Sequence, residues 1–454
     1  MEKNLFGTDG IRAKVGEFPL DIDSLILLGQ AIGLWAQKKY GLEKPIVIGN
    51  DTRESCDFIK SALKTGILPH KLDILDVGPL VTPGIFQIVK ASKVDLGIVI
   101  SASHNPYEYN GLKFFDRKKG KLSRDDEQAI SDLFFQQLTA KKSPCNSFDI
   151  ETIYHSFGIE TIQKGIAEFN YCMDLLKEFD KDTTFLANKK IIVDCAYGAI
   201  SFIAENVFEE FDNANIIYLH DDPDGTNINQ NCGAMHPEKL QKAVIKHKAD
   251  IGFAFDGDGD RVVVVNRHGE IKNGDDILAL LSTHPKYQKE KAVVGTIMSN
   301  YGLDAFLHKQ NKKLIRTQVG DKHIAQALTK QKLSLGAEPS GHVICRDYLN
   351  TGDGIFAALR VAEAAKLTDN WDLKTFEKFP QINMSIPVTQ KKDITTGTLA
   401  EIIAQAQTNL PAGRTVVRYS GTEPILRVMV EEKEEKTAQA VCATLVERLQ
   451  KELG

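Results

Sequence analysis

The sequence predicts an α/β protein with three similar α/β domains followed by a smaller α+β domain. Its 454 residues are too many for a single hydrophobic core. Up to about residue 370, short apolar runs alternate with helical patterns, which is typical of βαβ units in mixed, mostly parallel sheets. From about Lys374, predicted strands follow one another, and this favours an α+β arrangement.

The first domain is expected over residues 1–150, with the polar segment 141–146 near its end. Apolar runs rich in Ile, Val and Leu predict strands, and apolar residues spaced by three and four predict helices. The predicted strands are 45–49, 72–77 and 96–100, and the predicted helices are 22–40, 55–67 and 82–92.

The second and third domains are expected over residues 151–257 and 258–370. The second has predicted strands at 191–193, 215–218 and 251–255 and a helix at 237–248. The third opens with the apolar run 262–265 and continues with strands at 292–298, 314–319 and 333–337 and helices at 275–283, 301–310, 323–331 and 354–366.

The last domain is expected over residues 371–454. Its predicted strands are 382–388, 415–417 and 426–430, and its predicted helices are 395–408 and 434–452. The three preceding domains are similar in size and in the alternation of strands and helices, so a triplication is plausible from the pattern. They share no repeated sequence that would show it.

Composition excludes several classes of function. The net charge is −5 and no strongly basic stretch dominates, so neither nucleic acid nor a membrane is an expected partner. Seven cysteines without a CxxC pair favour reduced thiols over a disulfide framework or a structural zinc site. The first residues lack the pattern of a signal peptide, and no apolar run approaches the roughly 18 residues of a membrane span. We expect a cytoplasmic protein.

A polar segment, Ser101-Ala-Ser-His-Asn-Pro106, follows the predicted strand 96–100. A buried strand that ends in this way presents side chains at the edge of a sheet, and Ser103 and His104 would lie there. Two interpretations of Ser103 follow from its position. It is either a nucleophile or phosphate carrier, or a loop hydroxyl that caps a neighbouring element.

The segment Asp256-Gly-Asp-Gly-Asp-Arg261 carries the strongest chemical signal. Three carboxylates at alternate positions repel one another unless they surround a cation, and the glycines permit the tight backbone that this requires. An EF-hand does not fit, because Arg261 and Arg267 occupy the positions of its Gly and its bidentate Glu. Carboxylates without His or Cys favour Mg²⁺ over zinc, and its open positions would take phosphate oxygens.

Two further polar segments suit a phosphorylated sugar. Arg418 and Arg427 flank a Ser-Gly-Thr sequence whose hydroxyls and backbone N–H groups could bind a phosphate dianion. The segment Glu338-Pro-Ser-Gly-His342 follows a predicted strand, and Glu338 and Ser340 could hydrogen-bond sugar hydroxyls. Ordinary turns are the alternative for both segments.

Other catalytic motifs are absent from the sequence. It contains no GxxxxGK[ST] loop, no GxGxxG fingerprint after a strand and no GxSxG elbow. These absences argue against a nucleoside triphosphatase, a dinucleotide enzyme and an α/β-hydrolase.

The ordered set SHNP, DGDGDR, EPSGH and RYSGTEP resembles the α-D-phosphohexomutases, and only the whole set is highly specific. The resemblance covers nearly the whole chain, including residues 5–12 and 51–53. Residues 227–229, 232–234 and 351–354 resemble the branch that acts on glucosamine phosphates. The resemblance implies four domains around a central active-site cleft. It also implies the interconversion of glucosamine 6-phosphate and glucosamine 1-phosphate, on the route to UDP-N-acetylglucosamine.

The resemblance assigns a role to each matching position. Ser103 matches the phosphoserine, and Ser103, Asp256, Asp258 and Asp260 match the metal ligands. The catalytic positions are Ser103, His104, Lys113 and Arg12, with Lys113 as candidate general base. The substrate-binding positions are Arg261, Glu338, Ser340, His342, Arg418, Ser420, Gly421, Thr422 and Arg427.

The resemblance further implies one Mg²⁺ per active site and glucosamine 1,6-bisphosphate as intermediate or activator. The partners would be sugar phosphates, and the protein would be a monomer or a homodimer. The sequence departs from the branch at Pro339, where Gln or Met is common, and at Asn50, where Lys or Arg is usual. Pro339 removes a backbone N–H and stiffens the sugar-binding loop.

Three rival functions stay open at this point. A phosphomannomutase/phosphoglucomutase of the same family would use the same chemistry on another sugar. A serine-dependent hydrolase or phosphatase would release phosphate to water. A sugar-phosphate sensor would bind without catalysis.

Overall fold

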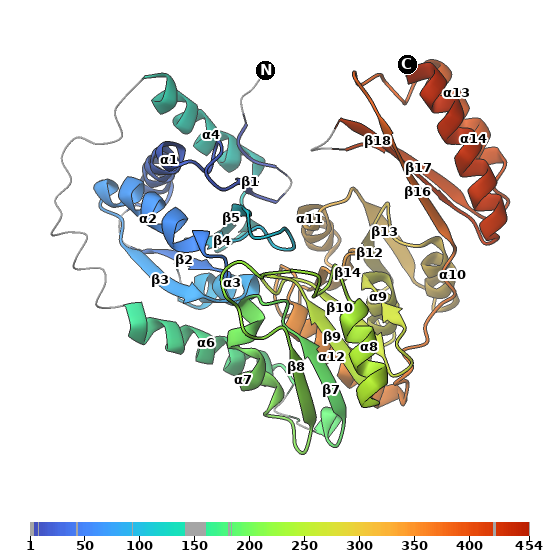
Figure 1. The fold of residues 1–454 in the computed structure, drawn as a ribbon, viewed down its shortest axis with the longest axis horizontal. Coiled ribbons are helices and arrows are strands. Elements are labelled where there is room, and N and C mark those ends of the chain that lie inside the picture. The colour runs from blue at the N-terminus through green and yellow to red at the C-terminus, as the bar shows by residue number, and fades with distance from the viewer. Residues whose placement is uncertain are drawn as a thin grey trace.

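The computed structural model describes residues 4–7, 9–41, 44–92, 94–140, 160–179, 182, 184–420 and 424–453. The expected polar segment 141–146 and the expected boundary at residue 150 lie outside these ranges. The fold is α/β, as expected, and contains four separate sheets that follow one another along the chain. Figure 1 shows the C-terminal sheet and its helices on the opposite side of the molecule from α1 (Ile22–Tyr40) and α2 (Ser55–Ile67).

Sheet 1 has the strand order β1-β5-β4-β2-β3, with β6 paired to β5. The strand β2 is parallel to β3 and β4, whereas β5 runs antiparallel to β1 and β4. Its strands are β1 (Ile11–Lys14), β2 (Ile46–Asn50), β3 (Ile74–Pro79), β4 (Leu96–Ile100), β5 (Tyr109–Asp116) and β6 (Gly120–Lys121). Besides α1 and α2, its helices are α3 (Thr82–Ala91), α4 (Arg124–Thr139) and a short 3₁₀ helix (Leu68–His70).

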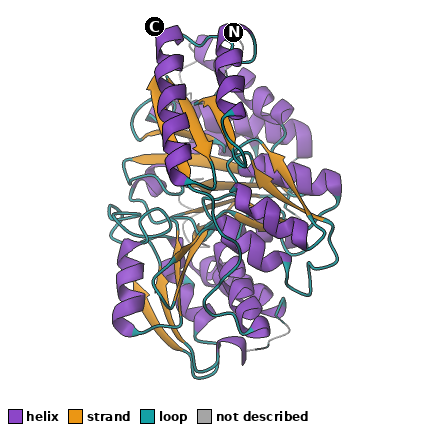
Figure 2. Cartoon of the chain, turned by 90° about the vertical axis from the view of Figure 1, so that its right-hand side faces the viewer, coloured by secondary structure: helices purple, strands orange, loops and turns teal. Residues whose placement is uncertain are grey.

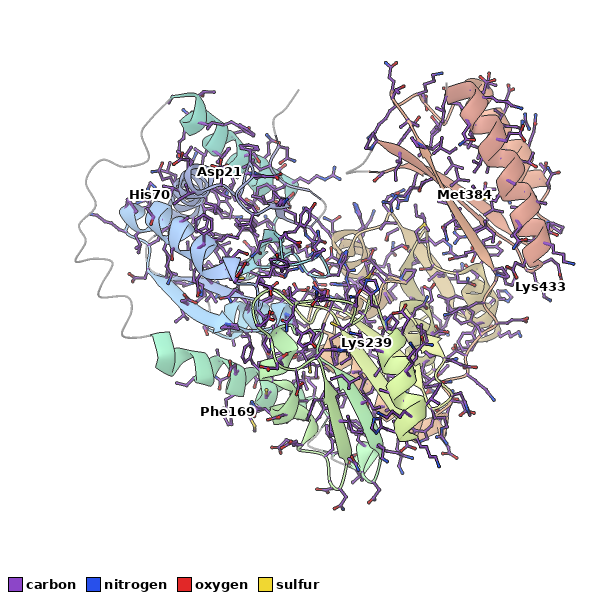
Figure 3. The ribbon with its side chains drawn as sticks, in the orientation of Figure 1. Asp21, His70, Phe169, Lys239, Met384 and Lys433 are labelled. Carbon is purple, nitrogen blue, oxygen red and sulfur yellow. The ribbon has the colours of Figure 1, made fainter. Side chains whose placement is uncertain are left out.

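The predicted strands and helices of sheet 1 are present within two residues at each end. The helix α1 begins at a side-chain cap, because Asp21, labelled in Figure 3, accepts a 3.0 Å hydrogen bond from the backbone N–H of Ser24. The strand β5 was not predicted. Asn110 and Gly111 interrupt its apolar pattern, yet both are buried in the sheet.

Sheet 2 has the order β11-β10-β9-β7-β8. Its strands are β7 (Lys190–Asp194), β8 (Asn215–Leu219), β9 (Ile251–Phe255), β10 (Val262–Asn266) and β11 (Ile271–Lys272). Its helices are α6 (Glu160–Lys177), α7 (Ala204–Phe208), α8 (Glu238–His247) and two 3₁₀ helices (Thr184–Leu186 and Ala199–Phe202).

The strand β10 corrects one expectation. The apolar run 262–265 was expected to open the third block, but β10 pairs antiparallel with β9, with Val262 opposite Phe255. A continuous apolar run marks a strand that is buried on both faces but does not specify its sheet. Residues 256–261 therefore form the loop of a hairpin inside sheet 2, and we propose the boundary between the second and third domains after β11.

Sheet 3 has the order β13-β12-β14-β15, and sheet 4 has the order β16-β18-β17. The strands of sheet 3 are β12 (Ala292–Thr296), β13 (Lys313–Thr317), β14 (Leu335–Ala337) and β15 (Val343–Cys345). Its helices are α9 (Gly274–Ser282), α10 (Tyr301–Lys309), α11 (Asp321–Gln331) and α12 (Gly354–Thr368). The strands of sheet 4 are β16 (Gln381–Pro387), β17 (Arg414–Tyr419) and β18 (Ile425–Glu431). Its helices are α13 (Gly397–Thr408) and α14 (Glu435–Leu453).

Sheet 4 carries its own hydrophobic core. Leu426 and Val430 of β18 pack with Leu399 of α13 and with Cys442 and Leu449 of α14. Figure 2 shows the C-terminal helix lying over the strands from the outer side. Sheet 4 joins the rest of the molecule by polar contacts, including a 2.6 Å hydrogen bond from Arg414 to the carbonyl oxygen of Ser299.

A single large core extends through the first three sheets. Val81 beside α3, Ile200 of sheet 2 and Phe356 of α12 belong to this one cluster. It fixes the ends of β4, β9 and β14 relative to one another, and these ends carry the polar segments identified in the sequence. Among the described helices, none is long and apolar enough to cross a membrane.

The N-terminus of α12 yields a testable pH dependence. Asp353 caps this helix by accepting a 2.9 Å bond from the N–H of Phe356, and it also accepts a bond from the hydroxyl of Tyr171. Burial raises the pKa of Asp353 to about 7. The folded protein therefore holds this proton more tightly than the unfolded chain does, and stability falls as pH rises between the two pKa values. We expect Asp353→Asn to raise the melting temperature at pH 8 relative to wild type, and to do so less at pH 5.

Melting curves at pH 5 and pH 8 measure this difference. The control is Asp132→Asn, an exposed position on α4, which should show no such dependence on pH. Equal changes in melting temperature at the two pH values for Asp353→Asn would contradict the prediction.

Candidate active site

Ser103 lies directly after β4 in a constrained loop. It is fully buried, and its φ of +55° places it in the left-handed region that non-glycine residues rarely adopt. Two side chains from distant segments hold its carbonyl oxygen: Arg53, which follows β2, at 3.2 Å and Asn229, in the loop between β8 and α8, at 2.9 Å. The loop is thus fixed by contacts on both sheets.

The hydroxyl of Ser103 points at the three aspartates of the β9–β10 hairpin. Its Oγ donates a 2.6 Å hydrogen bond to Oδ2 of Asp256. Asp256, Asp258 and Asp260 each offer an oxygen atom such that all three atoms lie within 4.8 Å of one another, and all three residues are buried. The structure therefore brings together two segments that are about 150 residues apart.

Packed carboxylates strongly perturb one another. Burial, with repulsion from Asp260 and Asp258, raises the pKa of Asp256 to about 7. The pKa of Asp260 shifts in the other direction. Burial disfavours its charge, but Lys113 and His342 more than offset this effect and hold its pKa well below the usual range.

Lys113 of β5 balances part of this negative charge. Its Nζ lies 2.7 Å from Oδ2 of Asp258 and 2.7 Å from Oδ2 of Asp260. Burial works against its charge, but Asp258, Asp260 and Asp9 raise the pKa of Lys113 well above its ordinary value. In this arrangement Lys113 is an ammonium ion paired with the triad.

The triad fits a hard divalent cation. Oδ1 of Asp258 is buried and has neither a hydrogen-bond nor an ion-pair partner among the described residues, and Oδ1 of Asp260 has only the more distant His342, at 3.5 Å, and Arg261, at 3.7 Å. Unpaired buried carboxylate oxygens are costly, and oxygen-only donor sets are those that Mg²⁺ and similar cations prefer. The three aspartates could thus hold such an ion beside the Ser103 hydroxyl.

Basic side chains surround the Ser103 hydroxyl. Arg12 of β1 pairs with Asp9 at 2.6 Å and donates to the carbonyl oxygen of Ala102 at 3.4 Å. Nε of Arg261 lies 3.8 Å from Asp256. His104 Nδ1 lies 3.4 Å from Ser103 Oγ, and burial together with Arg261 and Arg12 lowers the pKa of His104 to about 3. His104 is therefore a neutral imidazole near pH 7.

Glu338 and His342 reach the same region from the end of β14. His342 Nδ1 lies 3.5 Å from Asp260, and Oε1 of Glu338 accepts a 2.9 Å bond from the N–H of Gly320. Burial disfavours the charge of His342, but Asp260 raises its pKa overall. Ser340 is half-buried in the intervening turn. The structure thus places His342 of the EPSGH segment beside the aspartate triad.

The segment around Arg418 forms a separate group on sheet 4. Arg418 and Arg427 lie directly opposite each other on β17 and β18, beside a cavity of about 220 Å³. Burial and the charge of Arg427 lower the pKa of Arg418. Such like-charged pairs favour a bound anion. Among the described residues, no hydrogen bond or ion pair joins this pair directly to Ser103, and Gly421 and Thr422 lie outside the described ranges.

Several residues of the site were not identified from the sequence. Asp9 contacts Lys113 and Arg12, Thr82 donates a 2.6 Å bond to Oδ2 of Asp258, and Arg53 and Asn229 hold the Ser103 loop. Each lies in a different segment of the chain. The only available signal was that Asp9, Arg53 and Asn229 occur in stretches that support the family resemblance.

The backbone of Gly198 packs closely against that of Gly257, next to the aspartate triad. A substitution at Gly198 can therefore test whether the position of the triad matters without changing any polar side chain. A Cβ atom on Gly198 would lie 2.4 Å from the carbonyl oxygen of Gly257 and 2.7 Å from its Cα. Backbone atoms cannot yield as side chains do, so the hairpin loop must shift. We expect Gly198→Ala to lower kcat at least about tenfold, because small displacements of catalytic groups are costly.

The control for this substitution is Gly165→Ala on α6, where an added Cβ has nothing within 4 Å. It should leave the activity unchanged. An unaltered kcat for Gly198→Ala would show that the position of the triad tolerates this displacement.

Comparison with family models matches almost the entire chain. Four models of phosphoglucomutase/phosphomannomutase match in order: α/β/α domain I at residues 3–141, domain II at 170–269, domain III at 273–379 and the C-terminal domain at 358–448.

Curated relatives agree with these models. The phosphoglucosamine mutase of Acinetobacter baylyi is 39% identical over 97% of this chain and 98% of that protein. The phosphoglucosamine mutase of Nautilia profundicola is 38% identical over 99% of this chain and 100% of that protein.

Solved structures share the fold. A phosphoglucomutase/phosphomannomutase family protein from Burkholderia thailandensis aligns with a TM-score of 0.77 at 21% identity, over 98% of this chain and 97% of that chain. Aspergillus fumigatus N-acetylphosphoglucosamine mutase, in complex with GlcNAc-6P and magnesium, aligns with a TM-score of 0.65 at 17% identity, over 99% of this chain and 96% of that one. From the four matching models and the full-length relatives, the chain belongs to the phosphoglucomutase/phosphomannomutase family.

Proposed function

We propose that the protein is a mutase that interconverts glucosamine 6-phosphate and glucosamine 1-phosphate through a phosphorylated serine and a 1,6-bisphosphate. The observation that carries this proposal is the buried Ser103 hydroxyl, bonded at 2.6 Å to an aspartate of a three-carboxylate cluster. Relatives of nearly equal length that are named phosphoglucosamine mutase support the choice of sugar. The product would serve the synthesis of UDP-N-acetylglucosamine.

Phosphoryl transfer depends mainly on positioning and charge neutralisation. Ser103 would carry the phosphoryl group, and Asp256, Asp258 and Asp260 would hold one Mg²⁺. When bound, this ion would neutralise negative charge on the transferred group. Arg12 and Arg261 would supply further positive charge close to the phosphoryl oxygens.

Proton movement involves His104 and Lys113. His104 is neutral and within 3.4 Å of Ser103 Oγ, so it could accept a proton there. Lys113 matches the family's candidate base, but it is protonated in this arrangement. It would become a base only after losing its contacts with Asp258 and Asp260.

The sugar and its second phosphate would bind away from Ser103. Glu338, Ser340 and His342 would contact the sugar hydroxyls. The cationic pair on sheet 4, together with its turn, would hold the phosphate that is not being transferred; these residues are Arg418, Ser420, Gly421, Thr422 and Arg427. Generic phosphate donors accept either end of a bisphosphate, which allows the intermediate to bind in two orientations.

A coupled assay tests the choice of substrate. We expect kcat/KM for glucosamine 6-phosphate to exceed that for mannose 1-phosphate by at least about tenfold, the factor that corresponds to roughly 1.4 kcal/mol of transition-state stabilisation. A preference for mannose 1-phosphate would instead support the phosphomannomutase alternative. We further propose a cytoplasmic location and a monomeric or homodimeric state.

A further inference from the structure

A basic groove lies at the junction of sheets 1 and 3. Its volume is about 640 Å³, which is within the range of small-molecule sites. Among the described residues that line it, eight are Lys or Arg and none is Asp or Glu, although the chain as a whole carries a net charge of −5. The cationic residues are Lys90, Arg117, Lys118, Lys119, Lys121, Lys322, Lys330 and Arg346.

The groove lies at the opposite edge of both sheets from the catalytic residues. Arg117 to Lys119 form the turn after β5, beside the start of β4, because Leu96 pairs with Asp116. Ser103 follows the other end of β4. In the same way, Arg346 donates its N–H to the carbonyl oxygen of Ser334, just before β14, whereas Glu338 follows the end of β14.

Several of these charges have no acidic neighbour. In the described ranges, no carboxylate lies within ion-pair distance of Lys118, Lys330 or Arg346. Arg346 is fixed in place by a 2.7 Å bond from its Nε to the carbonyl oxygen of Leu333, which leaves its terminal nitrogens for another acceptor. Clustered like charges repel one another, and a bound polyanion removes this cost.

Asn350, which also lines the groove, carries a polar atom without a partner. Oδ1 of Asn350 is buried and accepts no hydrogen bond from any described residue. Asn350 lies beside the Arg117–Lys121 turn, since a Cβ on Gly120 would be 3.5 Å from its Nδ2. A buried acceptor without a donor is uncommon in native proteins. It would suit a ligand that carries a hydroxyl or N–H group as well as phosphates.

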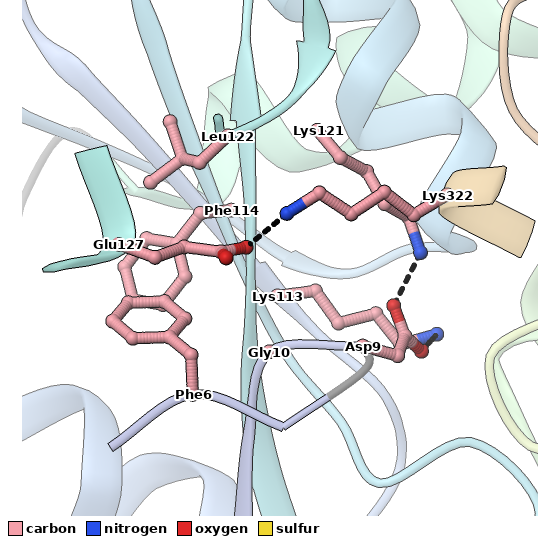
Figure 4. Close-up of a pocket in the computed structure, with 9 residues that line it drawn as sticks. All are labelled: Phe6, Asp9, Gly10, Lys113, Phe114, Lys121, Leu122, Glu127 and Lys322. Atoms are coloured by element: carbon pink, nitrogen blue, oxygen red, sulfur yellow. Dashed lines mark hydrogen bonds and ion pairs between the residues drawn. The ribbon is translucent and has the colours of Figure 1, made fainter. Parts of the chain in front are cut away.

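Lys121 links the groove to the catalytic residues by ion pairs, and Lys322 lies beside it. Lys121 pairs with Asp9 and Asp321, and Lys322 pairs with Glu127 at 2.7 Å; Figure 4 shows the pairs with Asp9 and Glu127. Both lysines also line the small pocket that contains Lys113. Asp9 lies 3.5 Å from Lys113, which binds the aspartate triad. An anion that draws Lys121 toward the groove would weaken its ion pairs with Asp9 and Asp321.

We propose that this groove is an effector site for a compound that contains a diphosphate, and that its occupation lowers the mutase activity. A diphosphate spans several cationic side chains at once, and the Asn350 oxygen adds a contact for a nucleoside or sugar part. The proposal concerns a site separate from the catalytic one, and it rests on the proposed function only for the sugar phosphate that blocks the catalytic site and for the effect on kcat.

Calorimetric titration with inorganic diphosphate and with uridine diphosphate tests binding. The titration uses saturating glucosamine 6-phosphate to occupy the catalytic site, at about 0.15 M salt to screen nonspecific attraction. We expect K118E/K330E to weaken binding at least about tenfold, because two attractive charge-assisted contacts become repulsive. The matched control is K239E/K433E, which reverses two exposed charges elsewhere (Figure 3) and should bind as wild type does.

Two further measurements complete the test. Asn350→Leu should weaken the binding of uridine diphosphate more than that of inorganic diphosphate if the ligand is a nucleotide. It should affect the binding of both equally if the ligand is the inorganic ion. Saturating diphosphate should lower kcat of the wild type but not that of K118E/K330E. The proposal is overturned if K118E/K330E binds diphosphate as tightly as wild type, or if the bound diphosphate leaves kcat of the wild type unchanged.

Discussion

Replacing Ser103 by alanine is expected to lower the mutase activity by about three orders of magnitude or more, because the group that carries the phosphate is lost. The substitution removes one buried oxygen atom that donates to Asp256, so the surrounding backbone should persist. The coupled assay with glucosamine 6-phosphate measures the activity, and melting curves check that the variant is folded. The control is Ser61→Ala, which removes an exposed hydroxyl from α2.

Mass spectrometry of the intact proteins gives an independent measure of the same prediction. Wild-type protein should show a fraction heavier by one phosphate group, which phosphatase treatment removes, and Ser103→Ala should not. A Ser103→Ala variant that keeps its mutase activity would exclude Ser103 as the phosphate carrier.

Replacing Asp258 by asparagine is expected to weaken the affinity for Mg²⁺ at least tenfold and to lower kcat by about two orders of magnitude. Asp258 accepts bonds from Thr82 and Lys113 through Oδ2 and keeps Oδ1 unpaired. The amide would have one carbonyl oxygen in place of two carboxylate oxygens and no negative charge. A hard cation in a buried site depends strongly on that charge.

Activity measured as a function of Mg²⁺ concentration checks this prediction, with calorimetry of Mg²⁺ binding as a direct readout. Asp57→Asn, an exposed carboxylate on α2, is the matched control. If Asp258→Asn required no more Mg²⁺ than the wild type, the aspartate triad would not be the metal site.

Local sequence patterns predicted many of the helices and strands. The strand β4 and the helices α1 and α2 were located correctly, because their apolar periodicity and flanking polar residues agree. The strand β5 was missed because Asn110 and Gly111 are buried through tertiary contacts, which a local pattern cannot show. The assignment of β10 to the third block was wrong, since an apolar run does not encode its pairing partner.

The candidate site was only partly accessible from the sequence. The spacing of Asp256, Asp258 and Asp260 indicated a cation site because repulsion between neighbouring carboxylates is a local property. Thr82 was not identified, because its contact with Asp258 arises only when sheets 1 and 2 pack together. Asp9 was not identified, because its contact with Lys113 joins two segments that are about 100 residues apart. The protonated state of Lys113 likewise depends on two aspartates that lie about 145 residues away.

The most direct test of the account follows the phosphate from enzyme to sugar. Protein labelled at Ser103 with radioactive phosphate would be mixed with unlabelled glucosamine 6-phosphate and quenched after single turnovers. The account predicts that the label leaves the protein and appears in glucosamine 1,6-bisphosphate and then in the monophosphates. Release of the label as inorganic phosphate at the rate of turnover, or its retention on Ser103 during turnover, would contradict the account.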